Sequence, residues 1–253
     1  MSSDGTGIVD AANEIGGHCP HEIRHEVMHM WWEDLTFLHY EIDPRQVQAI
    51  LPDGLRVDTL HGVTWVALVP FDMRVGLPGG WQLPRVGHFR ETNVRVYVVD
   101  RAGRRGVWFS SLEASDPLAV VTARATYGLP YFWADMSIER SGTKITYESR
   151  RRRPGPKGAR HRSVVRAGAS IPSAEVSEVE HFLTARWGLF SQWRGRLVYA
   201  PVEHDPWPLH RAELLELDDE LLAVAKLSPE TDVQPLVHWT PGTSIRIGRP
   251  RFV

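Results

Sequence analysis

The most informative stretch of the sequence is residues 89–99, which run Phe-Arg-Glu-Thr-Asn-Val-Arg-Val-Tyr-Val-Val. Valine and aromatic residues dominate it, which favours a β-strand. Successive side chains of a strand point to opposite faces of the sheet. One face therefore consists mainly of valines and suits a hydrophobic core. The other face carries four polar side chains in a row: Glu91, Asn93, Arg95 and Tyr97.

Two interpretations of this polar face are open. It could face solvent, with Glu91 and Arg95 forming a surface ion pair. Alternatively, it could line a barrel or cleft, where a partly buried Glu91 acts as an acid or base and Arg95 holds an anionic substrate. Strand periodicity alone does not distinguish the two.

The remainder of the chain indicates a mainly β fold with a few helices, of the α+β class. The 21 glycines and 18 prolines are spread throughout and separate short runs of β-branched and aromatic residues, which is typical of many short strands joined by turns. A helix is expected after Asp43-Pro44, where Asp43 can cap and Pro44 fits the first turn. A short helix is also expected after Asp116-Pro117. A further helix is expected within 177–188. We expect a flexible leader at 1–20 and a single domain at 21–253.

Composition excludes several classes of protein. The 253 residues carry a formal net charge of −2, which argues against a dedicated nucleic-acid partner. No apolar run approaches the roughly 20 residues that span a bilayer, and residues 1–10 lack a signal-peptide pattern. We therefore expect a cytoplasmic protein that does not insert into a membrane. The single cysteine, Cys19, cannot form an intrachain disulfide.

Two local patterns need a structural interpretation. His21-Glu22-Ile23-Arg24-His25 and the overlapping motif that ends at His29 match the His-Glu-x-x-His zinc pattern. No third ligand lies close by in the sequence, so we expect a solvated terminal helix and no metal, with zinc binding as the alternative. The four arginines at 150–153 precede Pro154-Gly155, and we expect a solvated loop between two strands.

Motifs for other chemistries are absent from the sequence. It has no Gly-x-Ser-x-Gly elbow and neither a phosphate-binding nor a dinucleotide-binding glycine pattern. Of the three lysines, only Lys226 has apolar residues on both sides, and a Schiff-base lysine needs an apolar or cationic environment. We expect no cofactor. The residues alone indicate that Arg124 is a surface charge or an ion-pair partner, and that His39 is a hydrogen-bonded core histidine.

Several ordered stretches resemble the YqjF-like family, a domain of unknown function numbered 2071. They include Leu-Pro-Asp-Gly-Leu at 51–55, Gly-Leu-Pro-Tyr at 128–131 and His-Asp-Pro-Trp-Pro-Leu at 204–209. The other matching stretches are 32–39, 62–66, 69–71, 89–98, 106–112, 147–150 and 182–187. The doubled His-Glu-x-x-His motif at 21–29 precedes the first of these stretches, which weakens the zinc hypothesis further.

This family is similar in turn to the acetoacetate decarboxylase-like superfamily. The resemblance implies a cone-shaped, mostly antiparallel β-barrel with an active site inside the cone. It therefore favours the interior position for Glu91 and its neighbours. One departure matters: the decarboxylase pattern has an arginine, a proline six residues later and then two lysines. Here Arg124 and Pro130 keep that spacing, but Tyr131 and Phe132 replace both lysines.

The combined hypothesis is a small-molecule pocket for a carboxylate or carbonyl compound, without a Schiff-base lysine. Glu91 and Tyr131 are the expected catalytic residues, for proton transfer, hydration or dehydration. The expected ligand-binding residues are Asn93, Arg95, Arg124 and His39. A non-catalytic binding module and a scaffold without ligand remain alternatives. Formation of a homo-oligomer is one way to cover exposed strand edges.

Overall fold

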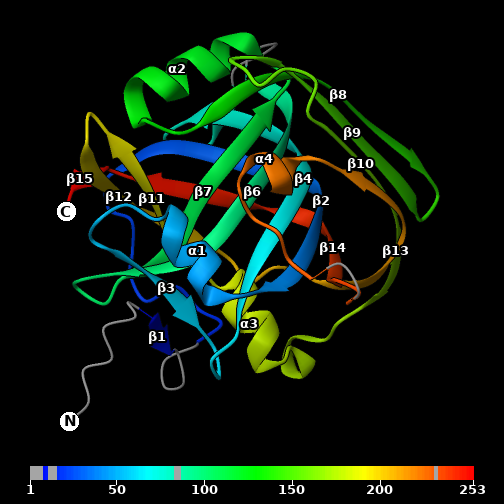
Figure 1. The fold of residues 1–253 in the computed structure, drawn as a ribbon, viewed down its shortest axis with the longest axis horizontal. Helices are drawn as coiled ribbons and strands as arrows, with labels where there is room; N and C mark the ends of the chain where they lie inside the picture. The colour runs from blue at the N-terminus through cyan, green and yellow to red at the C-terminus, as the bar shows by residue number, and fades with distance from the viewer. Residues whose placement is uncertain (1–7, 11–15, 83–86, 231–232) are drawn as a thin grey trace.

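The computed structural model describes residues 8–10, 16–82, 87–230 and 233–253. In this part of the chain, all strands join one mixed sheet of 15 strands (Figure 1). This confirms the mainly β fold predicted from the sequence. The strands are β1 (Ile8–Asp10), β2 (Glu26–Ile42), β3 (Leu55–Thr59), β4 (Thr64–Leu77), β5 (Trp81–Gln82), β6 (His88–Asp100), β7 (Arg105–Ala114), β8 (Tyr131–Ser141), β9 (Lys144–Arg153), β10 (Arg160–Ser170), β11 (Gly188–Trp193), β12 (Arg196–His204), β13 (His210–Asp219), β14 (Leu236–Gly248) and β15 (Arg251–Phe252).

Seven of these strands close into a ring. The order around the ring is β14, β2, β4, β6, β7, β11 and β12, and β12 pairs again with β14. All of these pairings are antiparallel except β7 with β11. Closure removes the free edges of these strands and encloses a space between their inward-facing side chains.

A second layer covers one side of the ring. Strands β8, β9, β10 and β13 run in order from β7 back to β14 and lie together at the right of Figure 1. Two hydrophobic cores result, and β6 contributes to both of them. Its Val94, Val96 and Val98 belong to the core under the outer layer, whereas Phe89 and Tyr97 belong to the core inside the ring. The polar face of β6 is therefore the inward face.

Four α-helices fill the connections: α1 (Pro44–Ile50), α2 (Pro117–Tyr127), α3 (Glu178–Thr184) and α4 (Leu221–Val224). The predicted cap at Asp43 is confirmed, because Asp43 accepts from Arg45 N at 2.8 Å. Asp116 caps α2 in the same way and accepts from Leu118 N at 2.8 Å. α3 begins with a capping box between Ser177 and Glu180. It is shorter than the predicted range because β11 already starts at Gly188.

The expected helix at the doubled His-Glu-x-x-His motif is wrong. Residues 21–25 form no helix, and β2 starts at Glu26. Met28, Met30 and Trp32 alternate toward the cavity inside the ring, so an apolar period of two outweighs the short helical pattern. His29 instead bonds Glu26 at 2.7 Å. The described residues contain no group of three or more His, Cys, Asp or Glu side chains suited to a metal ion.

The expected loop at 150–153 is also wrong. These arginines end β9, and Arg151 is buried. Its Nη2 lies 2.5 Å from Glu113 Oε1 on β7, and its Nε lies 3.0 Å from Glu113 Oε2. A buried carboxylate therefore holds one of the four arginines, while the exposed Arg152 pairs with Asp135.

Residues 1–7 and 11–15 of the expected leader lie outside the described residues. Between them, β1 pairs in parallel with β3. None of the described helices is long and apolar enough to cross a bilayer.

Candidate functional site

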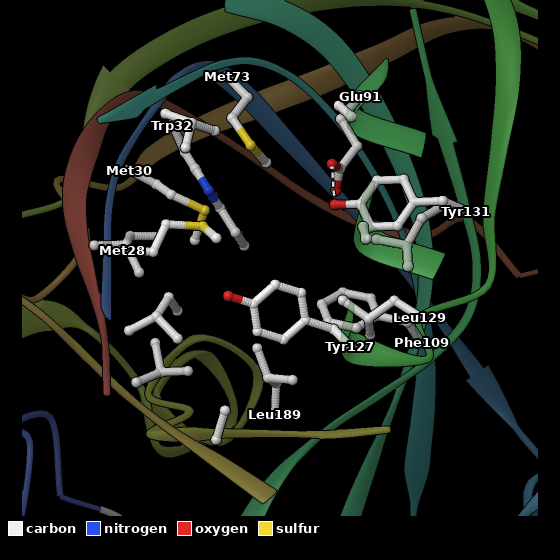
Figure 2. A pocket seen from close by; sticks show the side chains of 18 of the residues that line it. Met28, Met30, Trp32, Met73, Glu91, Phe109, Tyr127, Leu129, Tyr131 and Leu189 are labelled. Carbon is white, nitrogen blue, oxygen red and sulfur yellow. Dashed lines mark hydrogen bonds between the residues drawn. The ribbon is translucent and has the colours of Figure 1, made fainter. Parts of the chain in front are cut away.

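A cavity of about 330 Å³ lies inside the ring. Figure 2 shows side chains converging on it from opposite sides. Most of its wall is apolar, and α2 covers part of it with Leu118, Ala119 and Ala123. Every strand of the ring contributes to the wall, as shown by Met30, Met73, Glu91, Phe109, Leu189, Val202 and Ile245.

Glu91 lies on β6 and is 1% exposed. Tyr131 Oη donates a hydrogen bond to Glu91 Oε2 at 2.7 Å, drawn as a dashed line in Figure 2. Burial raises the pKa of Glu91 to about 7, and the hydrogen bond from Tyr131 offsets part of this effect. A carboxyl group with a pKa near neutrality can both accept and return a proton.

Tyr131 reaches Glu91 because β8 runs parallel to β7, which pairs Tyr131 with Leu112. Burial and the neighbouring Glu91 carboxyl raise the pKa of the Tyr131 phenol well above its ordinary value. Tyr131 therefore remains protonated and acts as a hydrogen-bond donor to Glu91.

Arg95 is the second charged group on the inward face of β6, and it is 5% exposed. Its Nη2 donates to Leu183 O at 3.3 Å, and its guanidinium lies 5.1 Å from the Phe37 ring centre. Its Nε has no hydrogen-bond partner. No carboxylate of the described residues lies within 4.0 Å of its guanidinium. An unpaired buried charge is costly, so this arrangement favours an anionic ligand.

Arg186 supplies a second guanidinium to the cavity wall. Its Nη1 lies 2.5 Å from Asp58 Oδ2, whereas its buried Nη2 has no partner. Burial lowers the pKa of Arg186, and the ion pair with Asp58 opposes this effect. Asp58 also pairs with Arg105 at 3.1 Å. The buried carboxylate of Asp58 therefore pairs with both Arg105 and Arg186, whereas Arg95 has no carboxylate partner among the described residues. The interior thus carries more positive than negative charge.

The sequence profile of the DUF2071 family, described as an uncharacterized conserved protein, matches residues 29–244. The chain belongs to the DUF2071 family. It is 34% identical over 216 residues to the uncharacterized protein YqjF of Bacillus subtilis (strain 168), which covers 84% of this chain and 87% of YqjF.

Two solved structures similar to this DUF2071 protein show its fold. The enduracididine biosynthesis enzyme MppR complexed with pyruvate has a TM-score of 0.62, 15% identity and 92% coverage of each chain. Acetoacetate decarboxylase from Legionella pneumophila has a TM-score of 0.61 and 16% identity, and covers 93% of this chain and 91% of its own. The fold implied by the sequence resemblance is therefore confirmed.

The positions of the two replaced lysines face opposite ways in this DUF2071 protein. Tyr131 points into the cavity toward Glu91, whereas the Phe132 ring lies 3.7 Å from the Arg151 guanidinium outside it. None of Lys144, Lys157 and Lys226 belongs to the described cavity wall.

The structure brings Glu91, Arg95 and Tyr131 together in the cavity wall, but not Arg124. The Arg124 side chain donates from Nη1 to Tyr131 O at 2.8 Å and is otherwise exposed. Arg124 thus holds the start of β8 from outside, which is a positioning contact.

Asn93 and His39 lie behind the wall. Asn93 is buried beside Glu91 on β6, and its side-chain amide helps to lower the pKa of that carboxyl group against the effect of burial. His39 pairs with Ala67 on β4, which in turn pairs with Arg95 on β6, so the small alanine separates His39 from Arg95. Burial, and secondarily the charge of Arg95, lower the pKa of His39 well below its ordinary value. Neither ring nitrogen has a partner, unlike the bonded core histidine that the sequence suggested.

Sequence reasoning missed Arg186 and His204 as wall residues. His204 lies between Trp187 and Trp207, with ring-centre distances of 4.5 and 5.2 Å. Burial lowers its pKa to about 4, so it is neutral at pH 7. Both residues lie in stretches that carry the family resemblance, which was the available signal.

Proposed function

We propose that this protein binds a small carboxylate or keto acid inside the ring and transfers a proton at the carbon next to the carbonyl group. The observation that carries the proposal is the buried Arg95, which has no carboxylate partner and shares an inward face with Glu91. A bound carboxylate would neutralise that charge through charge-assisted hydrogen bonds.

The proposed step assigns one role to each group. The ligand carboxylate binds Arg95 and Arg186. The ionised Glu91 takes a proton from the carbon adjacent to the carbonyl, and the electron pair moves onto the carbonyl oxygen as an enolate. The guanidinium groups stabilise that oxygen. Glu91 then returns the proton, while the hydrogen bond from Tyr131 keeps its carboxyl group oriented.

Two further features support this proposal over an iminium mechanism. None of the three lysines belongs to the cavity wall, and Tyr131 occupies a position where the decarboxylase pattern has lysine. The names of the structural neighbours, a pyruvate complex and an acetoacetate decarboxylase, favour small keto acids as the ligand class.

Binding is tested by thermal unfolding with 2-oxobutanoate. A ligand of the folded state must raise the melting temperature, and we expect this for the wild type. Arg95→Met should keep or increase the stability of the free protein, because it removes an unpaired buried charge, yet lose the response to ligand. A wild-type melting temperature that 2-oxobutanoate leaves unchanged contradicts the proposal and favours the scaffold alternative.

Catalysis is tested by NMR in D₂O, which follows deuterium exchange at carbon 3 of 2-oxobutanoate. We expect exchange above the protein-free rate, and a loss of at least 100-fold in Glu91→Gln. Glu139→Gln, which alters an exposed carboxyl on β8, is the matched control and should exchange normally. Binding without exchange would contradict the catalytic step and leave a binding module.

A further inference from the structure

One wall of the cavity is unusually rich in methionine. Three of the five methionines of the chain line it: Met28, Met30 and Met73. Figure 2 shows them beside Trp32, across the cavity from Glu91 and Tyr131. Methionine adapts its shape to a bound group, and its sulfur makes favourable contacts with aromatic rings. Neither property is needed for a ligand of three or four carbons.

The strand register orders the cavity along β6. Arg95 lies four residues from Glu91, which is about 13 Å along a strand. Phe89 lies one step beyond Glu91 on the same face and pairs with Met73, which pairs with Trp32 on β2. Along the cavity, the arginine therefore comes first, the carboxyl group second, and the methionine wall, formed by Met28, Met30 and Met73, third.

The cavity is also larger than a short keto acid requires. A cavity of about 150 Å³ accommodates benzene, which has six non-hydrogen atoms. The volume of about 330 Å³ is roughly twice that, which corresponds to about 12 non-hydrogen atoms by the same proportion. Pyruvate has only about half that number.

We propose that the ligand is a 2-oxo acid carrying an aromatic group, with its carboxylate at Arg95 and Arg186 and its ring against Met28, Met30 and Met73. This inference rests on the proposed function and specifies its substrate class. The order along β6 places Glu91 between Arg95 and the methionine wall, so its carboxyl group faces the part of the ligand that joins the charged end to the ring. The apolar wall offers the ring no charged partner, so the ring gains affinity by leaving water.

Calorimetric titration with three compounds tests this assignment. The compounds are 2-oxobutanoate, 4-phenyl-2-oxobutanoate and 4-phenylbutan-2-one, which keeps the ring and ketone but lacks the carboxylate. We expect 4-phenyl-2-oxobutanoate to bind at least tenfold more tightly than either of the others. Equal affinity for the two acids would overturn this inference while leaving the proposed function intact. Failure of both acids to bind would contradict the proposed function itself.

Variants of the methionine wall locate the ring. Met28→Gln and Met73→Gln keep the side-chain length but place an amide in the wall. Each should reduce the affinity for the phenyl acid at least fivefold and leave that for 2-oxobutanoate within twofold. Met136→Gln on β8, outside the cavity wall, is the matched control and should change neither. An undiminished preference for the phenyl acid in a folded Met28→Gln or Met73→Gln protein would overturn the placement of the ring.

Discussion

At the scale of single residues, Glu91 determines how the site responds to pH. Its pKa is about 7 in the folded protein, against an ordinary value of 4.5, because burial disfavours the charged form. Below pH 4.5 the carboxyl group is protonated in both the folded and the unfolded state, so it does not change the unfolding free energy. As the pH rises, the unfolded state loses its proton first, so this group lowers the stability of the fold until it ionises in the folded state near pH 7.

Glu91→Gln should remove this dependence. Relative to the variant, the wild type should lose about 3 kcal/mol of unfolding free energy between pH 4.5 and pH 7, with no further change above pH 8. Urea unfolding of both proteins across this range measures the difference. The contributions of other titratable groups, such as His39 and His204, are the same in both proteins and cancel. A difference that is independent of pH would show that Glu91 titrates normally.

Tyr131→Phe should shift the titration of Glu91 upward. The hydroxyl donates to Glu91 Oε2 and stabilises the ionised form, so its loss should raise the pKa of Glu91 by about one unit. Infrared difference spectroscopy of the protonated carboxyl band, with Glu91→Gln to assign the band, gives both pKa values. An unchanged or lower pKa in Tyr131→Phe would contradict the proposed hydrogen bond.

The sequence placed Glu91 and Arg95 on one face of a strand because periodicity depends only on neighbouring residues. It left the direction of that face open, and only the family resemblance favoured the interior. Arg186 and Asp58 lie 128 residues apart in the sequence, and no local pattern indicates that they meet. Arg124 kept its place in the decarboxylase spacing, yet its side chain binds the backbone of Tyr131 from outside.

At the scale of elements, the buried pair of Arg151 and Glu113 joins β9 to β7. Burial raises the pKa of Glu113, and the contacts with Arg151 and Ser111 oppose this effect. Removing one partner leaves the other charge buried and unpaired. Arg151→Met should therefore cost about 3–5 kcal/mol of stability, whereas the double variant Glu113→Leu/Arg151→Met should cost clearly less. Chemical denaturation compares the two, and equal losses would show that the pair is not coupled.

Gly128 ends α2 with a φ of 64°. A Cβ at this position would overlap the backbone carbonyl oxygen of Gln192 on β11. Gly103 has a similar φ of 78° but open space around it. We expect Gly103→Ala to cost about 1 kcal/mol from backbone strain, and Gly128→Ala to cost about 1–3 kcal/mol more because of the overlap. Similar losses in denaturant titrations would contradict the close approach of α2 to β11.

Element prediction succeeded where the signal was local and failed where it was not. The helices that follow Asp43 and Asp116 could be predicted because the capping aspartate and the first-turn proline are adjacent in the sequence. The doubled histidine motif at 21–29 suggested a helix, but its second half belongs to β2, whose alternating apolar residues from Met28 onward form a strand between β14 and β4. Arg151 was expected in solvent because Glu113, its partner, lies 38 residues earlier in the sequence.

At the scale of the whole molecule, closure of the seven-stranded ring creates the cavity and brings its wall residues together. Closure combines pairings between distant segments, such as β2 with β14 and β7 with β11. Propensity and periodicity do not encode such pairings, so the class of fold could be predicted from residues alone but its topology only through the family resemblance. Ring closure buries Arg95 and Glu91 together and so creates both the positive excess and the raised pKa.

The most direct test is the proton balance of ligand binding at pH 7. Calorimetric titration with 2-oxobutanoate in buffers of different ionisation enthalpy counts the protons taken up. His204 is neutral and Tyr131 protonated at this pH, whereas an anion bound at Arg95 raises the pKa of Glu91 further. We expect an uptake of up to about half a proton per ligand in the wild type, none in Glu91→Gln, and no binding in Arg95→Met. Binding without proton uptake, or undiminished binding by Arg95→Met, would contradict the proposed keto-acid site at Arg95 and Glu91.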